Sequence, residues 1–294
     1  MLGNPARKML LLLPLLFFLL DGASPLLAEE KAAVAPPVRE YSFGSFPFLA
    51  QPTLEGIFSP LAAELSAALA RPIHYESSAN FEKFTDNLAQ EQYDIAHIHP
   101  FDYVAIAAKA GYLPLVTRTE MLSALFVVKA ESPLKNGQDL RGKKIGLPPK
   151  VATVSYLARL ALLQAGIKPE MDVALRHFNT HQSCLQALLI GDIDACAVGP
   201  PVLRIFEAET QRQLRVILTS PEIPQTLFVV HQRVPPAERE IIQKTLLATR
   251  LKGVDPKLRK LFIPEAAAKG AYFRAVTDKE YDIVRSYLKM MTEK

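Results

Sequence analysis

The sequence predicts an α/β protein made of two lobes of like build, each a mostly parallel sheet with flanking helices. Two observations support this prediction. Strand-like and helix-like segments alternate in two successive series between residue 41 and about residue 209. The segment YDIAHIHP near the end of the first series also matches IDACAVGP, 100 positions later, near the end of the second series.

The first series begins with a strand over residues 41–46. A helix is expected over residues 59–70, because Ser59 can cap it, Pro60 suits its first turn and leucines recur every four residues. A strand, a helix, a strand and a helix are then expected over residues 73–78, 80–92, 94–99 and 101–111.

The second series repeats this order, with strands and helices in turn over residues 143–148, 154–166, 173–178, 181–191, 195–199 and 200–209. The apolar runs ALFVV and TLFVV link the series, and both suit strands that cross between lobes and form a hinge beside a cleft. The helical C-terminal segments 236–251 and 278–291 are expected to return to lobe one. Lobe one is thus predicted to hold residues 41–125 and 219–294, and lobe two residues 126–218.

The N-terminus is typical of a secretory signal peptide over residues 1–28. Arg7 and Lys8 precede an apolar run of about 12 residues, shorter than the roughly 20 needed to span a bilayer. Small residues follow, with a cut expected near Ala28, and residues 29–40 are expected to form a flexible lead-in. These features predict an exported protein, most simply one of a bacterial periplasm.

Composition argues against two other classes of protein. The formal net charge of +4 is weak and unclustered, which argues against a nucleic-acid partner. No specific nucleophile motif is present, so we expect no enzyme, no catalytic residue and no cofactor. The two cysteines, Cys184 and Cys196, are too few for a disulfide scaffold, and a disulfide and two buried thiols are equally compatible with the sequence.

The candidate binding residues follow the predicted strands, since ligands of open α/β sheets bind beyond the carboxyl ends of the strands. A helix start near Thr153 offers unpaired N–H groups to a small anion, with Thr153 and Ser155 as further donors. A simple helix cap is the alternative for this pair. His181, at the next helix start, can donate to an anion.

The pair His97 and His99 lies on one face of the strand over residues 94–99. With His181 across the cleft, the three imidazoles offer a conceivable metal or metalloid site. We favour separate roles instead, with His99 lining the cleft and His97 supporting the strand.

The motifs GSFPF, YDIAHIHPFDYV and FNTHQSCLQALLIGDIDACAVG, together with the segment KNGQDLRGKKIGLPPKVATVSYLARLALLQAG, resemble those of one family. The chain resembles the periplasmic solute-binding proteins of ABC importers, in the phosphate, phosphite and phosphonate-binding (PhnD-like) branch. The resemblance covers about residues 41 to 230. It implies a type 2 periplasmic-binding fold and ligand-binding roles at matching positions, namely Phe48, Tyr103, Thr153, Ser155, Tyr156 and His181.

This sequence departs from the family pattern at several of those positions. The family's Ser-Thr-Ser run is here Ala152-Thr153-Val154, Ser155 replaces a glycine, and Phe48 lacks a hydroxyl. The acidic residue that holds an amino group on some phosphonates is replaced by Gly199-Pro200-Pro201. This last departure argues against an aminophosphonate ligand.

The resemblance implies a monomer that captures a small oxyanion and delivers it to an ABC permease. A membrane sensor kinase in place of the permease, and the metal or metalloid site, are the alternatives.

Overall fold

The computed structural model describes residues 39–169, 171–263 and 271–292. The chain divides into Met1–Pro37 and Val38–Lys294, and every described residue belongs to the second unit. The expected signal peptide and nearly all of the expected lead-in lie outside the described residues. Within the described ranges, no helix combines the length and apolar character needed to cross a bilayer.

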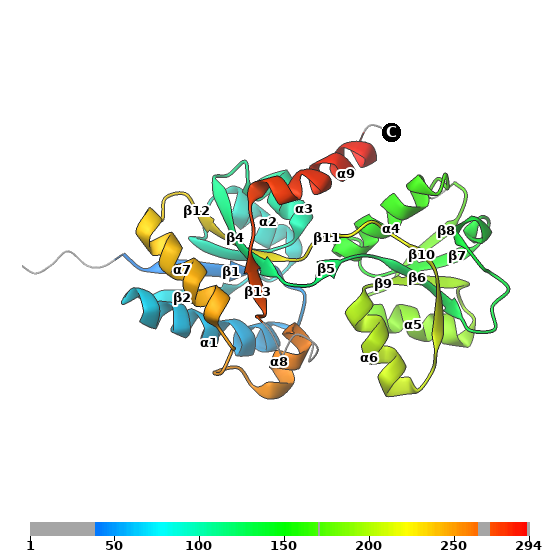
Figure 1. The fold of residues 1–294 in the computed structure, drawn as a ribbon, viewed down its shortest axis with the longest axis horizontal. Helices are drawn as coiled ribbons and strands as arrows, with labels where there is room; N and C mark the ends of the chain where they lie inside the picture. The colour runs from blue at the N-terminus through cyan, green and yellow to red at the C-terminus, as the bar shows by residue number, and fades with distance from the viewer. Residues whose placement is uncertain (1–38, 170, 264–270, 293–294) are drawn as a thin grey trace, which may run out of the picture. The chain divides into compact units, whose positions relative to one another are not determined.

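The first lobe contains six strands: β1 (Tyr41–Ser45), β2 (Ile73–Ser77), β3 (Ile95–Ile98), β4 (Tyr112–Arg118), β12 (Leu227–His231) and β13 (Phe273–Ala275). They form one sheet in the order β13-β4-β12-β3-β1-β2 (Figure 1). Strands β1, β2 and β3 are parallel, whereas β12 runs antiparallel to both β3 and β4. Strand β13 adds antiparallel to β4.

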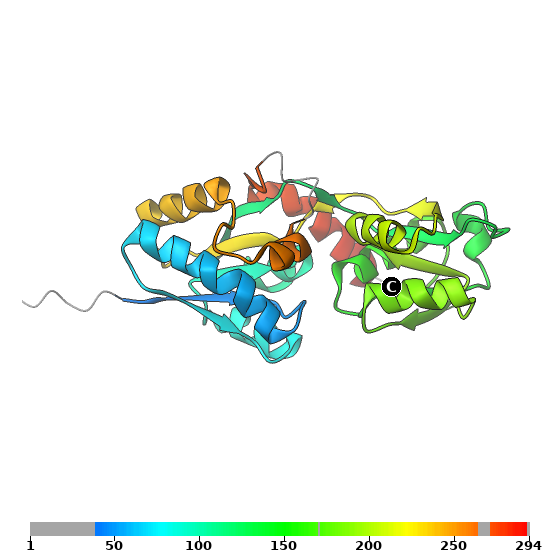
Figure 2. The same ribbon diagram turned by 90° about the horizontal axis from the view of Figure 1, so that it is seen from below.

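Helices cover both faces of this sheet. Successive residues of a strand face opposite sides, so the neighbours of Ile95 and Ala96 show which helices lie on each face. Ile95 packs with α1 (Gln51–Leu69), α7 (Pro236–Ala248) and α8 (Pro256–Phe262). The next residue, Ala96, packs with the opposite group: α2 (Phe81–Ala89), α3 (Pro100–Asp102), η1 (Tyr103–Ala107) and α9 (Asp282–Thr292). Figure 2 shows α1 and α7 side by side on the first of these faces.

The second lobe contains five strands: β6 (Leu125–Lys129), β7 (Lys144–Leu147), β8 (Ala174–His177), β9 (Ala195–Val198) and β10 (Leu214–Thr219). Their order is β10-β6-β9-β7-β8. The helix α4 (Thr153–Gln164) packs on one face, and α5 (His181–Ile190) and α6 (Pro200–Thr210) pack on the other. A short 3-10 helix, η2 (Gly137–Leu140), precedes β7.

The two sheets are more mixed than the sequence predicts, although the two-lobe α/β fold class is confirmed. Each sheet keeps a parallel core, β2-β1-β3 in one and β8-β7-β9 in the other. Strands that arrive directly from the other lobe add antiparallel, as β12 does to β3 and β6 does to β9. They have no crossover helix, and only a crossover returns the chain in the parallel direction.

The segments that cross between the lobes differ from the expected ones. The crossing pair is β5 (Met121–Leu122) with β11 (Ile223–Pro224), a short antiparallel ladder. The apolar runs themselves lie inside the sheets, ALFVV largely as β6 and TLFVV largely as β12. Runs of four or five consecutive apolar residues are better buried in a sheet that helices cover on both faces than in a segment that crosses between lobes. The predicted lobe boundaries at residues 125/126 and 218/219 stay a prediction.

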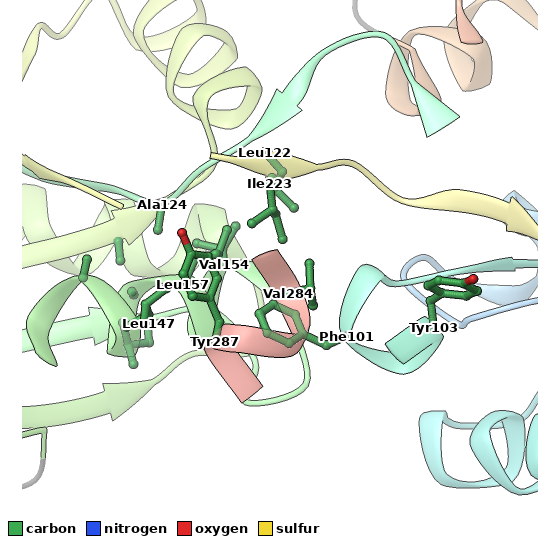
Figure 3. Close-up of a cluster of buried hydrophobic side chains, with 14 of the residues drawn as sticks. Phe101, Tyr103, Leu122, Ala124, Leu147, Val154, Leu157, Ile223, Val284 and Tyr287 are labelled. Atoms are coloured by element: carbon green, nitrogen blue, oxygen red, sulfur yellow. The ribbon is translucent and has the colours of Figure 1, made fainter. Parts of the chain in front are cut away.

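One hydrophobic cluster includes residues of both lobes. Leu122 and Ile223 of the crossing strands pack in it with Val154 of α4 and with Val284 and Tyr287 of α9. Figure 3 shows these side chains gathered between α4, α9 and the crossing strands. The crossing strands therefore have a continuous apolar core beside them.

The matched segments YDIAHIHP and IDACAVGP have the same backbone geometry. The Asp94 N–H donates to the Ser42 carbonyl at 3.0 Å, and a carboxylate oxygen of Asp94 accepts from the Ser42 N–H at 3.0 Å. In the second lobe Asp194 makes the same pair of contacts with Lys144, at 2.9 and 2.8 Å. Each aspartate thus joins the start of a buried strand to its parallel neighbour.

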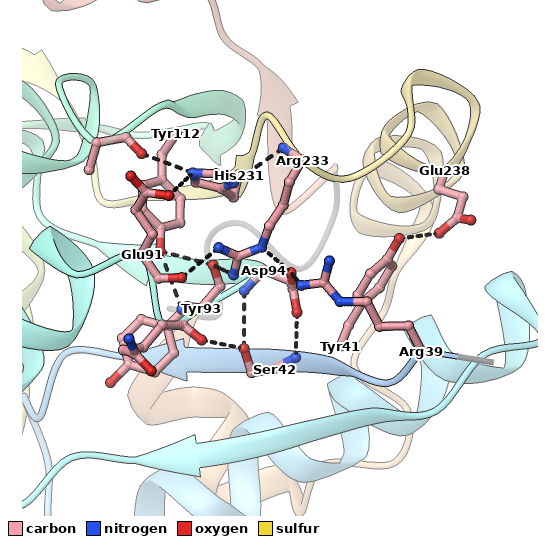
Figure 4. Close-up of polar contacts among 12 residues, drawn as sticks. Arg39, Tyr41, Ser42, Glu91, Tyr93, Asp94, Tyr112, His231, Arg233 and Glu238 are labelled. Atoms are coloured by element: carbon pink, nitrogen blue, oxygen red, sulfur yellow. Dashed lines mark hydrogen bonds and ion pairs between the residues drawn. The ribbon is translucent and has the colours of Figure 1, made fainter. Parts of the chain in front are cut away.

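Asp94 makes additional contacts that Asp194 lacks among the described residues. Its carboxylate accepts from Arg39 at 2.8 Å and from Arg233 at 2.7 Å, and its side chain is only 4 % exposed (Figure 4). Arg233 also donates to the carbonyl oxygens of Glu91 and Tyr93. The buried charge is therefore paired and hydrogen-bonded, as a carboxylate in an apolar interior must be.

Candidate functional site

Three strands of the first lobe end at one edge of its sheet. Strands β1 and β3 are parallel, and β4 runs parallel to β3 because β12 is antiparallel to both. Phe46 to Phe48 follow β1, His99 follows β3, and Arg118 ends β4. These residues therefore occupy the carboxyl edge where an open α/β sheet binds its ligand.

His97 is buried below this edge, as expected for a supporting residue. Its ring lies between Phe46 and Phe228, with centroids 5.1 and 4.8 Å away, and it is 1 % exposed. Its Nε2 lies 3.1 Å from the Thr226 hydroxyl oxygen, and its Nδ1 has no hydrogen-bond partner among the described residues. Burial lowers the pKa of His97 well below its usual value, so the ring is neutral at pH 7.

His99 lies closer to the edge, beside Phe46, with ring centroids 3.8 Å apart. Its Nδ1 is 3.6 Å from a carboxylate oxygen of Asp102, too long for a hydrogen bond. Burial lowers the pKa of His99 to about 3 and raises the pKa of Asp102 to about 6. At pH 7 a neutral imidazole therefore lies beside a partly buried carboxylate, and His99 can donate one N–H to a ligand.

The other two expected residues of the first lobe differ in their surroundings. Phe48 is half-buried and lies against Phe46, with centroids 4.6 Å apart. Tyr103 is fully buried against Tyr281, and its hydroxyl donates to Asp278 at 2.6 Å. A ligand contact by the Tyr103 hydroxyl therefore requires exchange of the Asp278 partner and stays a prediction.

The start of α4 carries an unpaired hydroxyl in the second lobe. Ala152 is the N-cap and offers no side-chain bond, so neither Thr153 nor Ser155 caps the helix. Thr153 is 5 % exposed, and its Oγ1 has no hydrogen-bond partner among the described residues. The Ser155 hydroxyl is placed differently, since it lies within 3.1 Å of the carbonyl oxygens of Pro148 and Pro149. Ser155 thus holds the turn before the helix.

His181 is the first residue of α5, directly after the cap. Thr180 caps the helix by accepting from the Ser183 N–H at 3.0 Å, which leaves His181 free of that role. The His181 Nδ1 is buried without a hydrogen-bond partner in the described part of the chain. Burial lowers the pKa of His181 to about 4, so its ring is also neutral at pH 7.

Tyr156 joins the two lobes at this site. Its ring stacks on Phe101 of α3, with centroids 4.8 Å apart and planes 24° apart. Burial is the main reason that the pKa of Tyr156 is raised, and the Asp102 carboxylate adds to it. Tyr156 of α4 is therefore a close neighbour of Phe101 and Asp102. Asp102 in turn lies beside His99, so these residues connect the His99 side of the first lobe to the start of α4 in the second.

The structure does not support the metal alternative. Among the described residues, no three His, Cys, Asp or Glu side chains are grouped so that they could hold a metal ion. The open question about the cysteines is answered, because Cys184 and Cys196 form a disulfide between α5 and β9.

The sequence predicts neither a role for Arg118 at the sheet edge nor the raised pKa of Asp102. Asp102 follows a motif histidine by three residues, which is a usable signal for a neighbour on one helical turn. Arg118 ends an unexpected strand, and no motif in the sequence indicates its burial.

Comparison with known families identifies the chain. The family described as the phosphonate periplasmic substrate-binding protein of ABC transporters matches residues 43–281. The chain belongs to this family. Its members are periplasmic proteins of transport rather than enzymes, in agreement with the resemblance noted in the sequence. A search of curated protein sequences finds no match.

Several solved structures share the fold of this chain. PhnD1 from Prochlorococcus marinus, in complex with methylphosphonate, has a TM-score of 0.68 and 15 % identity over 87 % of this chain and 99 % of that one. A Pseudomonas aeruginosa binding protein of an ABC phosphonate transporter has a TM-score of 0.63 and 15 % identity, covering 85 % of each chain. A Xanthomonas citri protein bound to ATP has a TM-score of 0.66 and 16 % identity, covering 84 % and 95 %.

Proposed function

We propose that the protein captures a small oxyanion, such as phosphate, phosphite or an alkylphosphonate, between the strand ends of its two lobes. Family membership and two buried, unpartnered polar atoms support this proposal. The Thr153 Oγ1 and the His181 Nδ1 both lie at helix starts, where backbone N–H groups favour an anion. Buried polar atoms without partners are costly, and a ligand oxygen would satisfy them.

The charge state of the site also supports an anion that accepts hydrogen bonds. Burial keeps His97, His99 and His181 neutral at pH 7, so each ring keeps one N–H donor and adds no charge. The ligand would be held by the helix dipole and the Thr153 hydroxyl at the start of α4. The first lobe would line its side of the ligand site with Phe48, His99 and Tyr103. Tyr156 of the second lobe, stacked on Phe101, would close the site.

The remaining parts of the proposal rest on the family and on the expectations from the sequence. The mature protein would be a periplasmic monomer, released by cleavage near Ala28, that delivers its ligand to an ABC permease rather than to a sensor kinase. It would have no catalytic activity, no cofactor and no nucleic-acid partner.

Titration calorimetry tests this function with methylphosphonate, phosphite, phosphate and sulfate. We expect at least one of the three phosphorus oxyanions to bind. We expect Thr153→Val to weaken that binding about tenfold, because a hydrogen bond to a charged group contributes roughly 1.5–3 kcal/mol. The same substitution should leave the unfolding midpoint nearly unchanged, since the Thr153 Oγ1 has no partner within the described protein.

Ser155→Ala is the matched control for this variant. Its hydroxyl contacts the Pro148 and Pro149 carbonyls, so its loss should reduce stability by about 1 kcal/mol and leave affinity largely intact. The proposed function is wrong if protein refolded free of ligand takes up none of the four anions.

A further inference from the structure

Arg118 ends β4 at the same level of the sheet edge as His99. Leu227 of β12 pairs with Ile98 on one side and with Thr117 on the other. One residue further along, the Arg118 N–H donates to the Thr226 carbonyl at 3.4 Å. Arg118 is thus separated from the β3 end only by Thr226.

Arg118 also shares a face of the sheet with His97. Phe228 lies opposite His97 on one side and opposite Val116 on the other, so all three side chains point the same way. Residues two apart in a strand share a face, which places Arg118 on the His97 side. In agreement with this placement, burial is the main cause of the low pKa of His97, and the positive charge of Arg118 lowers it further.

The Arg118 guanidinium is largely buried and poorly paired. Its side chain is 15 % exposed. The nearest carboxylate oxygen, from Glu120, is 3.7 Å away, beyond hydrogen-bond distance. In the part of the chain that the structure describes, no residue accepts a hydrogen bond from this guanidinium. A buried guanidinium has five donors to satisfy, so the arrangement is costly without a further acceptor.

Glu120 is shared between the two lobes. Its other carboxylate oxygen lies 3.6 Å from Arg204 of α6. One carboxylate therefore lies between two guanidinium groups, and this group of three carries one excess positive charge. The Glu120 oxygen next to Arg118 is itself buried without a hydrogen bond among the described residues.

The same region lies close to the unpaired hydroxyl of α4. Glu120 precedes the crossing strand β5, and Leu122 of that strand packs in one cluster with Val154. Val154 is the neighbour of Thr153 in α4, and Figure 3 shows it beside Leu122 and Ile223. Glu120 and the start of α4 thus both lie beside the crossing strand β5.

We propose that Arg118 is a ligand-contacting and specificity-determining residue. Its guanidinium binds the anionic group of the ligand, and Glu120 is an internal carboxylate that the ligand displaces from Arg118. The inference rests on the proposed function and adds the charged contact that the helix starts lack. A planar guanidinium binds two oxygens of one group at once, so the ligand should carry at least two oxyanion oxygens on one atom.

Calorimetry on three single variants tests this assignment with methylphosphonate, phosphite and phosphate as probes. Arg118→Gln should weaken binding by about tenfold to a hundredfold, the range of a charge-assisted hydrogen bond. Glu120→Gln should tighten binding several-fold, because it removes the competing carboxylate. Arg176→Gln is the control, since Arg176 is 57 % exposed, pairs with Asp192 on the second lobe and changes the net charge equally.

Each outcome decides the proposal. If the unaltered protein binds and Arg118→Gln binds within twofold of it, Arg118 is not a ligand contact, while the proposed function stands. If the unaltered protein binds no probe, the proposed function fails and this inference fails with it. Should Arg118→Gln not fold, Glu120→Gln decides: tighter binding supports displacement, and unchanged or weaker binding overturns it.

Discussion

Burial shifts the pKa values of individual side chains at the binding edge in the direction that disfavours their charged forms. Burial lowers the pKa of His99 and of His181, and it raises the pKa of Asp102 to about 6. These shifts have opposite consequences for stability. The free energy of unfolding decreases as pH falls below about 6.5, because the histidines take up protons more readily in the unfolded chain. It also decreases as pH rises from 3.8 to about 6, because Asp102 loses its proton more readily in the unfolded chain.

We expect Asp102→Asn to stabilise the folded protein at neutral pH. The rise in the Asp102 pKa corresponds to a penalty on the order of 1–3 kcal/mol above pH 6, because the ionised carboxylate is poorly solvated there. The variant should therefore gain that much unfolding free energy at pH 7 and almost none at pH 3.5. Urea unfolding at the two pH values measures the difference.

Asp86→Asn provides the comparison for this prediction, because Asp86 is exposed on α2. It should change stability little at either pH. An equal gain from Asp102→Asn at pH 3.5 and pH 7 would show that ionisation of Asp102 is not the cause.

The sequence predicts the positions of the site residues better than their roles. Strand periodicity places His97 and His99 on one face, and helix-start signals place Thr153 and His181. The engagement of Ser155 with two carbonyls depends on the fold of the preceding proline turn, which no local pattern encodes. The position of Arg118 at the sheet edge depends on the pairing of β4 with β12, which lies more than 100 residues further along the chain.

Among the elements, α5 and β9 are joined by the Cys184–Cys196 disulfide, which links two positions 12 apart in the sequence. The strand β7 passes close to this bridge. A Cβ on Gly146 would lie 2.6 Å from the Cys184 sulfur and 2.5 Å from Ile193, so only glycine fits there. The parallel core of the second lobe is thus packed around a covalent link.

Loss of the disulfide should destabilise the second lobe by about 3 kcal/mol, since closure of a loop of this length restricts the unfolded chain by that amount. Urea unfolding with and without reductant measures the effect. A Cys184→Ala/Cys196→Ala variant should match the reduced protein and show no response to reductant. A reduced protein with the oxidised midpoint would contradict the prediction.

Most elements are predictable because each carries its own periodicity. Between β1 and α6 the expected elements occur in the expected order, and most ends fall within one or two residues, but the sequence does not predict the strand β4. The largest difference in position is at α1, which begins at Gln51 and not at Ser59. Pro52 takes the first-turn position that the sequence assigns to Pro60, and Pro60 lies inside the helix. Two prolines eight positions apart offer the same local signal, and only packing selects which of them starts the helix.

At the scale of the whole molecule, the cluster around the crossing strands joins residues of both lobes in one hydrophobic core. Its members come from α3, α4, α9 and both crossing strands (Figure 3). Val284 is fully buried in it, and Tyr287 is 7 % exposed. A shared core of this kind couples the unfolding of its parts.

Calorimetric unfolding should therefore show one transition for both lobes. Tyr287→Ala should lower the midpoint and broaden or split the transition, because removal of a buried aromatic ring costs roughly 3 kcal/mol or more. Ile283→Ala is the control, since Ile283 lies on α9 but is 37 % exposed. Two separate transitions in the unaltered protein would contradict the shared core.

The position of β12 sets the order in which the chain can be assembled. All five strands of the second lobe lie between Leu125 and Thr219. The sheet of the first lobe cannot form completely before β12 is available, because β12 lies between β3 and β4. Arg233, which completes the pairing of the buried Asp94, arrives directly after that strand. As the chain emerges from the ribosome or from an export channel, the second lobe is thus complete while the first still lacks a central strand. A nascent chain that ends before residue 227 leaves β3 and β4 with open edges, which is a state suited to recognition by a chaperone.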